Sequence, residues 1–510
     1  MKKTLQILCL LLFCESLFAQ QRAHNPVIYA DVPDMSMVRV GDTYFMSSTT
    51  MHMSPGVPVM SSKDLINWKL ESYCYDILVD NDAMNLDNGQ STYGRGSWAS
   101  CIRYQNGEFL VSTFSATSGK TYIFRSKDIK GPWKEQTFKP SYHDHTIFFD
   151  DDGKVYMIYA AGRLKILELK PDLSGLMPGV EEQVLIENAS APAGDNIMLG
   201  AEGSQLFKIN GKYYLFNITW PRGGMRTVII HRADNIHGPW EGRIGLQDMG
   251  VAQGGLIDTP DGRWFAYLFK DNGGVGRIPY LVPVKWEDGW PVLGENGKVP
   301  MTLDLPPNKS LIPELVNSDE FERKEKTLPL QWQWNHNPDN ALWSIEKGSL
   351  RLQTGRVDTA FVFAKNTLTQ RTFGPESSAN TQLSTKGMND GDFAGLCLLQ
   401  KNYGLLGIKI IDGQKYLTME SLAAGEEARI PWKKKKVYLK ADCDFKEGKD
   451  LAQFYYSENG KSWKAIGAPM KMPYTLPHFM GYRFGLFNYA TQQVGGYADF
   501  DFFRISDTLN

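Results

Sequence analysis

Short runs of alternating apolar and polar residues fill the first 300 residues, and each pair of runs is joined by a turn that contains glycine. The five turn glycines are Gly41, Gly107, Gly153, Gly211 and Gly262, and an aromatic residue follows each within three positions. Four of them come directly after Asn or Asp, the pairing typical of β-hairpin turns. No sustained helical periodicity interrupts this pattern. The glycines lie 66, 46, 58 and 51 residues apart, and strand-rich repeats of this period predict a five-bladed β-propeller.

The pattern changes after the fifth repeat. Residues 306–318 begin with Pro306-Pro307 and are predicted to be a linker between a propeller over residues 20–305 and a second domain over residues 319–510. The second domain alternates strands with polar turns but has no blade repeat. It is therefore predicted to be a β-sandwich of the jelly-roll or concanavalin type.

The N-terminus has the charge order of a secretory signal. Lys2-Lys3 precede an apolar stretch that ends near Phe18, and Ala19 offers a small residue for cleavage. Residues 1–19 are predicted to be removed on export to the periplasm or the exterior. Cys14 leaves a lipoprotein as the alternative, which the bulky Phe13 disfavours. No later segment is long and apolar enough to span a bilayer.

Charge and cysteine usage restrict the remaining possibilities. The net charge of −2 gives no sign of a nucleic-acid partner, and we expect a monomer. Four cysteines remain after signal removal: Cys74, Cys101, Cys397 and Cys443. None has a metal-type spacing. An exported protein can form disulfides, but four cysteines in so long a chain are more simply small core residues.

Counting back from the turn glycines brings polar residues into register. Asp34 lies seven residues before Gly41, and four other residues lie nine before their own glycines: Trp98, Asp144, Glu202 and Gln253. Positions seven and nine before a turn share a face because side chains in a strand alternate with period two. The innermost strand of each blade lines the propeller axis, so these residues are predicted to converge on one pocket.

Three of the five converging residues are carboxylic acids. Acids held together in a low-dielectric pocket repel one another, so at least one pKa should be raised. Such a set can divide a proton donor from a proton acceptor. Glu202 has small and apolar neighbours and is the better donor on environment, whereas Asp34 looks more polar and is the better base. Asp144 is then expected to orient the other two carboxyl groups. The alternative is that acids at the ends of the blades only accept hydrogen bonds from backbone amides.

The same alternation bears on a histidine pair. It places His143 and His145 on the opposite face from Asp144. We therefore expect no metal shared among these three residues.

These motifs closely resemble glycoside hydrolase family 43, whose members are inverting exo-enzymes on a five-bladed propeller. The resemblance rests on Pro33-Asp34-Met35-Ser36, on Asp144 ahead of the Phe149–Gly153 hairpin, on Glu202-Gly203 and on Trp98-Ala99-Ser100. Met35 and Ser100 depart from the family pattern. The resemblance implies that Asp34 is the general base, Glu202 the general acid, and Asp144 the residue that adjusts the pKa of the acid.

The resemblance also implies substrate contacts. Arg277 would anchor the terminal sugar, Trp98 would form a stacking wall, and Trp220 would shape an outer subsite. Gln253 is also expected among the substrate-binding residues; it stands where many members hold an axial calcium through histidine, so a structural calcium stays open there. A second calcium is an open possibility at Asp319 and Asp501 in the sandwich.

The resemblance further implies an activity that needs no cofactor for its chemistry. The segments 252–255, 277–280 and 286–291 look most like the subfamily dominated by α-L-arabinofuranosidases, which release terminal arabinofuranose from plant polysaccharides. A β-D-xylosidase, or a dual activity, is the alternative within the class, and a non-catalytic glycan-binding propeller is the alternative outside it. The sandwich is expected to complete the pocket with a loop or to stabilise the propeller rather than to bind glycan independently.

Overall fold

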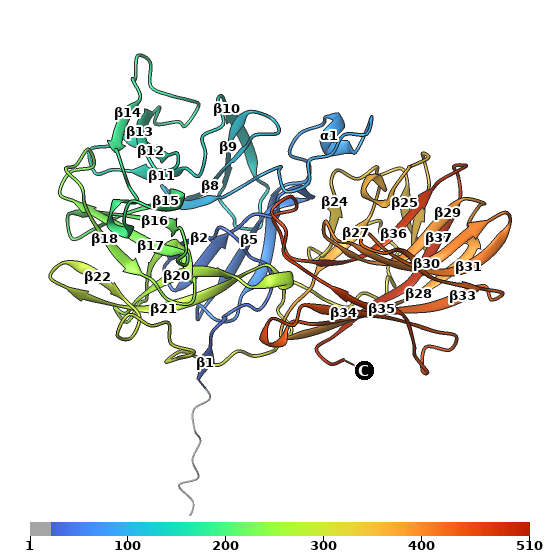
Figure 1. Cartoon of the computed structure of the whole chain (residues 1–510). Helices are drawn as coiled ribbons and strands as arrows, with labels where there is room; N and C mark the ends of the chain where they lie inside the picture. Colours follow the sequence, from blue (N-terminus) through green and yellow to red (C-terminus); the bar gives the residue numbers. More distant parts are fainter. Residues whose placement is uncertain (1–21, 510) are drawn as a thin grey trace, which may run out of the picture.

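The structure is a computed structural model that describes residues 22–509, and the predicted signal segment lies outside these residues. The described chain is nearly all β-strand, in two bodies that lie side by side (Figure 1). Its helical elements are the short α1 (Asp82–Asn85) and four single 3₁₀ turns, η1 (Ala191–Ala193), η2 (Gly273–Val275), η3 (Phe361–Phe363) and η4 (Lys446–Gly448). No helix among these residues is long and apolar enough to cross a membrane.

The first body is a propeller of five four-stranded antiparallel sheets, as predicted. From the axis outward, the first two blades consist of β2 (Ser36–Val40), β3 (Thr43–Ser47), β5 (Gly56–Ser62) and β6 (Lys69–Tyr75), and of β7 (Cys101–Gln105), β8 (Glu108–Ser115), β9 (Lys120–Ser126) and β10 (Lys134–Phe138). The third consists of β11 (Thr146–Phe149), β12 (Val155–Tyr159), β13 (Leu164–Leu169) and β14 (Gln183–Ile186). The last two consist of β15 (Ile197–Ile209), β16 (Lys212–Pro221), β17 (Thr227–Ala233) and β18 (Glu241–Leu246), and of β19 (Ala252–Asp258), β20 (Trp264–Asp271), β21 (Arg277–Glu287) and β22 (Trp290–Leu293).

The glycine turns explain why each blade begins with a hairpin. All five glycines have positive φ, and they lie between the first and second strands of their blades. Asn106 and Asn210 also have positive φ, next to Gly107 and Gly211, which is the conformation of a two-residue type I′ turn. Neighbouring blades then share apolar cores, as where Val59 of the first blade and Val111 of the second lie in one buried cluster. The hairpins thus set the register, and the shared cores bury the blade faces.

The second body is a sandwich of two antiparallel sheets, which confirms the predicted fold class. The eight-stranded sheet runs in the order β32 (Gly425–Pro431), β31 (Gln414–Ser421), β30 (Gly404–Ile411), β29 (Asp392–Leu399), β36 (Arg483–Ala490), β27 (Leu368–Arg371), β24 (Gln333–Asn335) and β4 (Met53–Ser54). The seven-stranded sheet runs in the order β25 (Trp343–Glu346), β26 (Ser349–Gln353), β37 (Tyr497–Ser506), β28 (Glu376–Gly387), β33 (Lys436–Asp444), β34 (Leu451–Ser457) and β35 (Lys464–Lys471). The four cysteines Cys74, Cys101, Cys397 and Cys443 are buried free thiols, consistent with their interpretation as core residues.

The two bodies are joined by a strand that the sequence pattern did not reveal. β4 belongs to the first-blade segment of the chain, yet it pairs with β24 at the edge of the eight-stranded sheet. The side chain of Gln333 in β24 donates to Thr50 Oγ1 at 2.9 Å and to the Pro55 carbonyl at 2.7 Å. Because backbone pairing and buried side-chain bonds cross the junction, the sandwich is anchored to the propeller.

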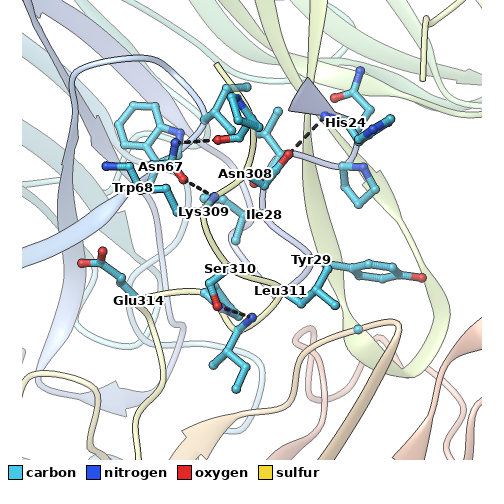
Figure 2. A pocket seen from close by; sticks show the side chains of 18 of the residues that line it. His24, Ile28, Tyr29, Asn67, Trp68, Asn308, Lys309, Ser310, Leu311 and Glu314 are labelled. Atoms are coloured by element: carbon cyan, nitrogen blue, oxygen red, sulfur yellow. Dashed lines mark hydrogen bonds between the residues drawn. The ribbon is translucent and has the colours of Figure 1, made fainter. Parts of the chain in front are cut away.

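The proline-bearing segment between the bodies lies against the propeller. Lys309 N–H donates to Asn67 Oδ1 at 2.8 Å, and His24 N–H donates to Asn308 Oδ1 at 3.1 Å (Figure 2). Nearby, β1 (Ala23–His24) pairs with β23 (Thr302–Leu303). A cavity of about 550 Å³ lies between this segment and the N-terminal strand. Its lining contains none of the residues predicted to converge on the axis, so the candidate site lies elsewhere.

Candidate active site

Two of the predicted acids lie at the entrance to innermost strands rather than within them. Asp34 precedes β2 by two residues and Asp144 precedes β11 by two residues, with φ of 51° and 48°. Gln253 near the start of β19 has φ of 54°. A left-handed backbone is uncommon for residues other than glycine, although Asp and Asn tolerate it best. Its recurrence in three blades points to a shared local geometry at the mouth of the axis.

The predicted carboxylates do converge. Asp34 and Asp144 line one small axial cavity together with Gln253. Carboxylate oxygens of Asp144 and Glu202 and a ring nitrogen of His143 all lie within 4.8 Å of one another. Glu202 comes from β15, so the acids are contributed by the first, third and fourth blades. The prediction of one acidic site built from separate repeats is thus consistent with the geometry.

Arg277 at the start of β21 is paired with Asp34. Its Nη1 donates to both carboxylate oxygens of Asp34 at 2.8 and 2.9 Å, and its backbone N–H donates to Asp31 Oδ1 at 2.7 Å. The side chains of Arg277 and Asp34 are only 2% and 7% exposed. A buried carboxylate is costly unless paired. Arg277 therefore supports the charged form of Asp34, whatever else it contacts.

Burial controls the proton affinities of the site. It raises the pKa of Asp34, and the Arg277 guanidinium opposes this rise. Burial also raises the pKa of Asp144 to about 7, with His143 opposing and the Glu202 and Asp34 charges adding to the rise. The sequence suggested that Asp34 would be the more polar of the proton-handling pair. The structure instead makes it more buried than Glu202, whose side chain is 19% exposed.

The expectation for His143 was wrong. Its Nε2 lies 3.1 Å from Glu202 Oε2 and 3.9 Å from Asp144 Oδ2, inside the acidic site. The left-handed backbone of Asp144 breaks the two-residue alternation on which that expectation rested. His145 does turn away, with Nε2 2.9 Å from Ser112 Oγ and Nδ1 3.0 Å from the Tyr142 carbonyl. The two histidines therefore have different hydrogen-bond partners.

The charges around His143 fix its protonation. Burial alone would lower the pKa of His143, but the hydrogen bond to Glu202 and the charges of Asp144, Glu202 and Asp34 outweigh it and raise the pKa to about 9. His143 is therefore cationic near neutral pH. It supplies a positive charge beside Glu202, and Arg277 supplies one beside Asp34.

A loop of the sandwich closes over these residues, and sequence reasoning missed it. Between β35 and β36, Phe479 places its ring 4.3 Å from Arg277 Cζ and accepts a hydrogen bond from Arg277 Nη2 at its carbonyl, at 3.1 Å. The same ring stacks on Trp98, with centroids 5.9 Å apart. The sandwich thus contributes a side chain to the site, one of the roles expected for it. No periodicity marks Phe479, which lies 202 residues from Arg277 in the chain.

The other predicted contacts lie around the same mouth. Trp98 is partly exposed and lies between the rings of Phe479 and His143. Trp220 pairs across the β15–β16 hairpin with Leu199, three residues before Glu202, and its ring lies 5.1 Å from Arg226 Cζ. Trp220 therefore lies further along the hairpin that carries Glu202, in a position suited to an outer rim.

The axial cavity is a poor calcium site. It has a volume of about 10 Å³, room for about one water molecule, whereas calcium takes six to eight oxygen ligands. Arg277 already binds both oxygens of Asp34, and Gln205 Oε1 accepts a hydrogen bond from Ser36. Among the acidic and amide side chains that line the cavity, only Asp144 and Gln253 are then left to offer oxygen ligands. The residues present do not fit the ion, and no step of the chemistry is assigned to one.

The possible calcium site in the sandwich also receives no support. Both oxygens of Asp319 are bound by Arg323, at 2.8 and 2.7 Å. Trp332 Nε1 donates to Asp319 as well. Asp501 binds the side-chain amide of Gln382 instead of joining Asp319.

Comparison with known proteins agrees with this geometry. Residues 23–291 match the model of glycosyl hydrolases family 43, and residues 318–506 match that of the β-xylosidase C-terminal concanavalin A-like domain. A relative named β-xylosidase from Formosa agariphila is 28% identical over 94% of this chain and 89% of its own. A relative named non-reducing end α-L-arabinofuranosidase BoGH43B from Bacteroides ovatus is 30% identical over 68% of this chain and 67% of its own.

A solved structure matches more closely still. The bifunctional GH43-CE protein of Bacteroides eggerthii is 64% identical, with a TM-score of 0.95 over 96% of this chain. This chain spans 64% of the length of that protein. The match of the family model to more than half of the chain, with a propeller that brings acids of three blades together, identifies this chain as a member of glycosyl hydrolases family 43.

Proposed function

We propose that this protein is an inverting, exo-acting glycosidase that removes terminal α-L-arabinofuranosyl residues from plant cell-wall polysaccharide side chains. The observation that carries the proposal is the convergence of Asp34, Asp144 and Glu202 on one mouth of the propeller, where Arg277 contacts Asp34 and His143 contacts Glu202. A lectin would need hydrogen-bonding groups at such a mouth, but it would not need two buried acids whose pKa values are raised, as those of Asp34 and Asp144 are.

Two carboxyl groups divide the proton transfers in this scheme. Asp34 takes a proton from a water molecule as that water attacks the anomeric carbon, and Glu202 gives a proton to the departing glycosidic oxygen. The attack and the departure occur on opposite faces of the sugar, so the configuration inverts. Arg277 keeps Asp34 ionised in spite of its burial, and Asp144 orients the pair. Family 43 chemistry needs no cofactor.

Exo action follows from the depth of the site. Beneath the carboxylates the axial cavity admits about one water molecule, and Phe479 covers the Arg277 side. A narrow inner end and a covered Arg277 side support the binding of a terminal sugar rather than of the middle of a polysaccharide chain. Trp98 offers an aromatic face for that sugar.

The identity of the sugar separates two candidates. The arabinofuranosidase reading is supported by the segments 252–255, 277–280 and 286–291 and by the likeness to the Bacteroides ovatus relative. A β-D-xylosidase, or a dual activity, is the second candidate because several relatives carry that name. Terminal arabinofuranose and terminal xylose present similar hydroxyl groups to one pocket.

One set of assays tests the proposal. Purified protein is incubated with aryl α-L-arabinofuranoside and aryl β-D-xyloside, alongside Asp34→Asn and Glu202→Gln. We expect hydrolysis of the arabinofuranoside and losses of several orders of magnitude in both variants. Faster hydrolysis of the xyloside selects the second candidate. Binding without hydrolysis of either glycoside overturns the enzyme proposal in favour of a glycan-binding propeller.

We further propose that the protein is exported and acts as a monomer in the periplasm or outside the cell. The support for export is the Lys2-Lys3 and apolar pattern of residues 1–19. Fractionation of cells that produce the full chain tests the first point: activity found in the cytoplasm, with residues 1–19 still attached, contradicts it. Light scattering of the purified chain tests the second.

A further inference from the structure

His143 is held in place by its surroundings and not only by its hydrogen bond. Its backbone carbonyl accepts from Ala160 N–H at 3.0 Å. Its ring meets Phe114 edge to face, with centroids 5.3 Å apart, and Trp98 at 6.0 Å. With these contacts, Nε2 is directed to Glu202 Oε2 at 3.1 Å. The side chain is 38% exposed, so it lies at the solvent edge of the acidic site.

The hydrogen bond between His143 and Glu202 has a direction that matters for chemistry. A protonated imidazole carries a hydrogen on both ring nitrogens, so Nε2 donates and Glu202 Oε2 accepts when His143 is cationic. The raised pKa of His143, at about 9, is consistent with a protonated Nε2. The other titratable and charged groups that face His143 are Asp34, Asp144 and His145. Of these groups and Glu202, only Glu202 has an oxygen at hydrogen-bond distance from His143 Nε2.

We propose that His143 is a positioning residue for the proton-donating carboxyl group of Glu202, an inference that rests on the function proposed above. His143 Nε2–H holds Oε2 of Glu202 and so fixes the direction of the carboxyl group. As the O–H bond of Glu202 breaks and the proton passes to the glycosidic oxygen, Glu202 becomes a carboxylate. The hydrogen bond from the cationic His143 then joins two opposite charges and is stronger than in the ground state, where the Glu202 carboxyl group is neutral. An interaction that strengthens in the transition state accelerates the reaction.

This role makes a specific demand on the substrate. A sugar is a poor leaving group and needs the proton of the acid, whereas a 2,4-dinitrophenolate is a good leaving group and departs without it. Loss of a residue that acts through the acid therefore harms glycosides with poor leaving groups most. Loss of a residue that only supports the fold of the pocket harms all substrates alike.

The experiment compares two variants. His143→Phe keeps a ring between Trp98 and Phe114 but removes the N–H donor, and His143→Gln keeps an N–H donor near the position of Nε2. Each is assayed for kcat/KM on 2,4-dinitrophenyl, 4-nitrophenyl and phenyl glycosides of the sugar that the unaltered protein prefers. Glu202→Gln is measured in parallel, and thermal unfolding shows that each variant is folded.

We expect His143→Phe to lose about 10- to 100-fold on the phenyl glycoside, the range for a hydrogen bond to a charged group, and little on the dinitrophenyl glycoside. His143→Gln should recover most of the loss. Equal losses of His143→Phe across the series, or no loss on the phenyl glycoside, overturn this inference while Glu202→Gln still shows the leaving-group dependence. If Glu202→Gln itself lacks that dependence, the role proposed for Glu202 fails first.

Discussion

Replacement of Arg277 by methionine tests how the site keeps its base charged. Arg277→Met retains the length of the side chain but removes the group that binds both oxygens of Asp34 at 2.8 and 2.9 Å. At about 4 Å and an effective dielectric constant of about 20, such a pair is worth about 4 kcal/mol. Each factor of ten in proton affinity corresponds to about 1.36 kcal/mol, so Asp34 should bind its proton roughly a thousandfold more tightly in the variant.

The consequence is a displaced pH profile. Because a protonated Asp34 cannot act as a base, the acid limb of kcat/KM should move to higher pH by about three units, with recovery at alkaline pH. The assay is kcat/KM against pH, with Arg277→Lys as the matched control that keeps the charge without the planar fork. An acid limb that coincides with that of the unaltered protein would show that Arg277 does not control Asp34.

Three further outcomes follow from the geometry. Burial raises the pKa of Asp144 to about 7, above its value of about 3.9 in an unfolded chain, so the folded protein loses stability as pH rises between these values. Asp144→Asn avoids that cost, so calorimetry should show that it unfolds at a higher temperature than the unaltered protein at pH 8 but not at pH 4. An equal difference in unfolding temperature at both pH values would contradict this. The Tyr93 ring stacks on His478, the neighbour of Phe479, with ring centroids 4.2 Å apart. Tyr93→Leu should therefore lower kcat/KM when it is the only substitution and have little further effect when combined with Phe479→Ala. Additive losses in the double variant would mean that Tyr93 does not act through Phe479. Dialysis against EDTA should change neither Tm nor kcat, because the axial donors do not fit calcium, and a loss restored by calcium would refute that reading.

The blade pattern was predictable because it is local. Each hairpin depends on one glycine, mostly after Asn or Asp, between two runs of alternating apolar and polar residues. All of these signals lie within a few residues of one another in the sequence. Counting from Gly153 and Gly211 then placed Asp144 and Glu202 at equivalent depths. The same counting brought Trp98 and Gln253 to the mouth of the axis. Counting from the turn glycines thus brought these residues to one mouth, although the strand alternation assumed for it does not hold at Asp144.

The errors arose where geometry is not local. The left-handed backbone of Asp144 turns the side chain of its neighbour His143 to the opposite face. The sequence does not reveal this φ angle, so His143 was assigned to the wrong face. Phe479 reaches Arg277 from another domain, and Met53–Ser54 leave the blade to pair with β24. No spacing of residues in the sequence predicts either contact. The burial of Asp34 was also misjudged, because its pairing with Arg277 joins the first blade to the fifth and is not a local contact.

The stereochemistry of the first product tests the central claim most directly. Hydrolysis of an aryl α-L-arabinofuranoside is followed by ¹H NMR from the first turnovers, before the released sugar equilibrates between its anomers. Water activated by Asp34 on the face opposite the leaving group predicts that β-L-arabinofuranose appears first. Initial release of the α-anomer would mean that the configuration is retained, which a single water-mediated displacement cannot produce, and would contradict the roles proposed for Asp34 and Glu202.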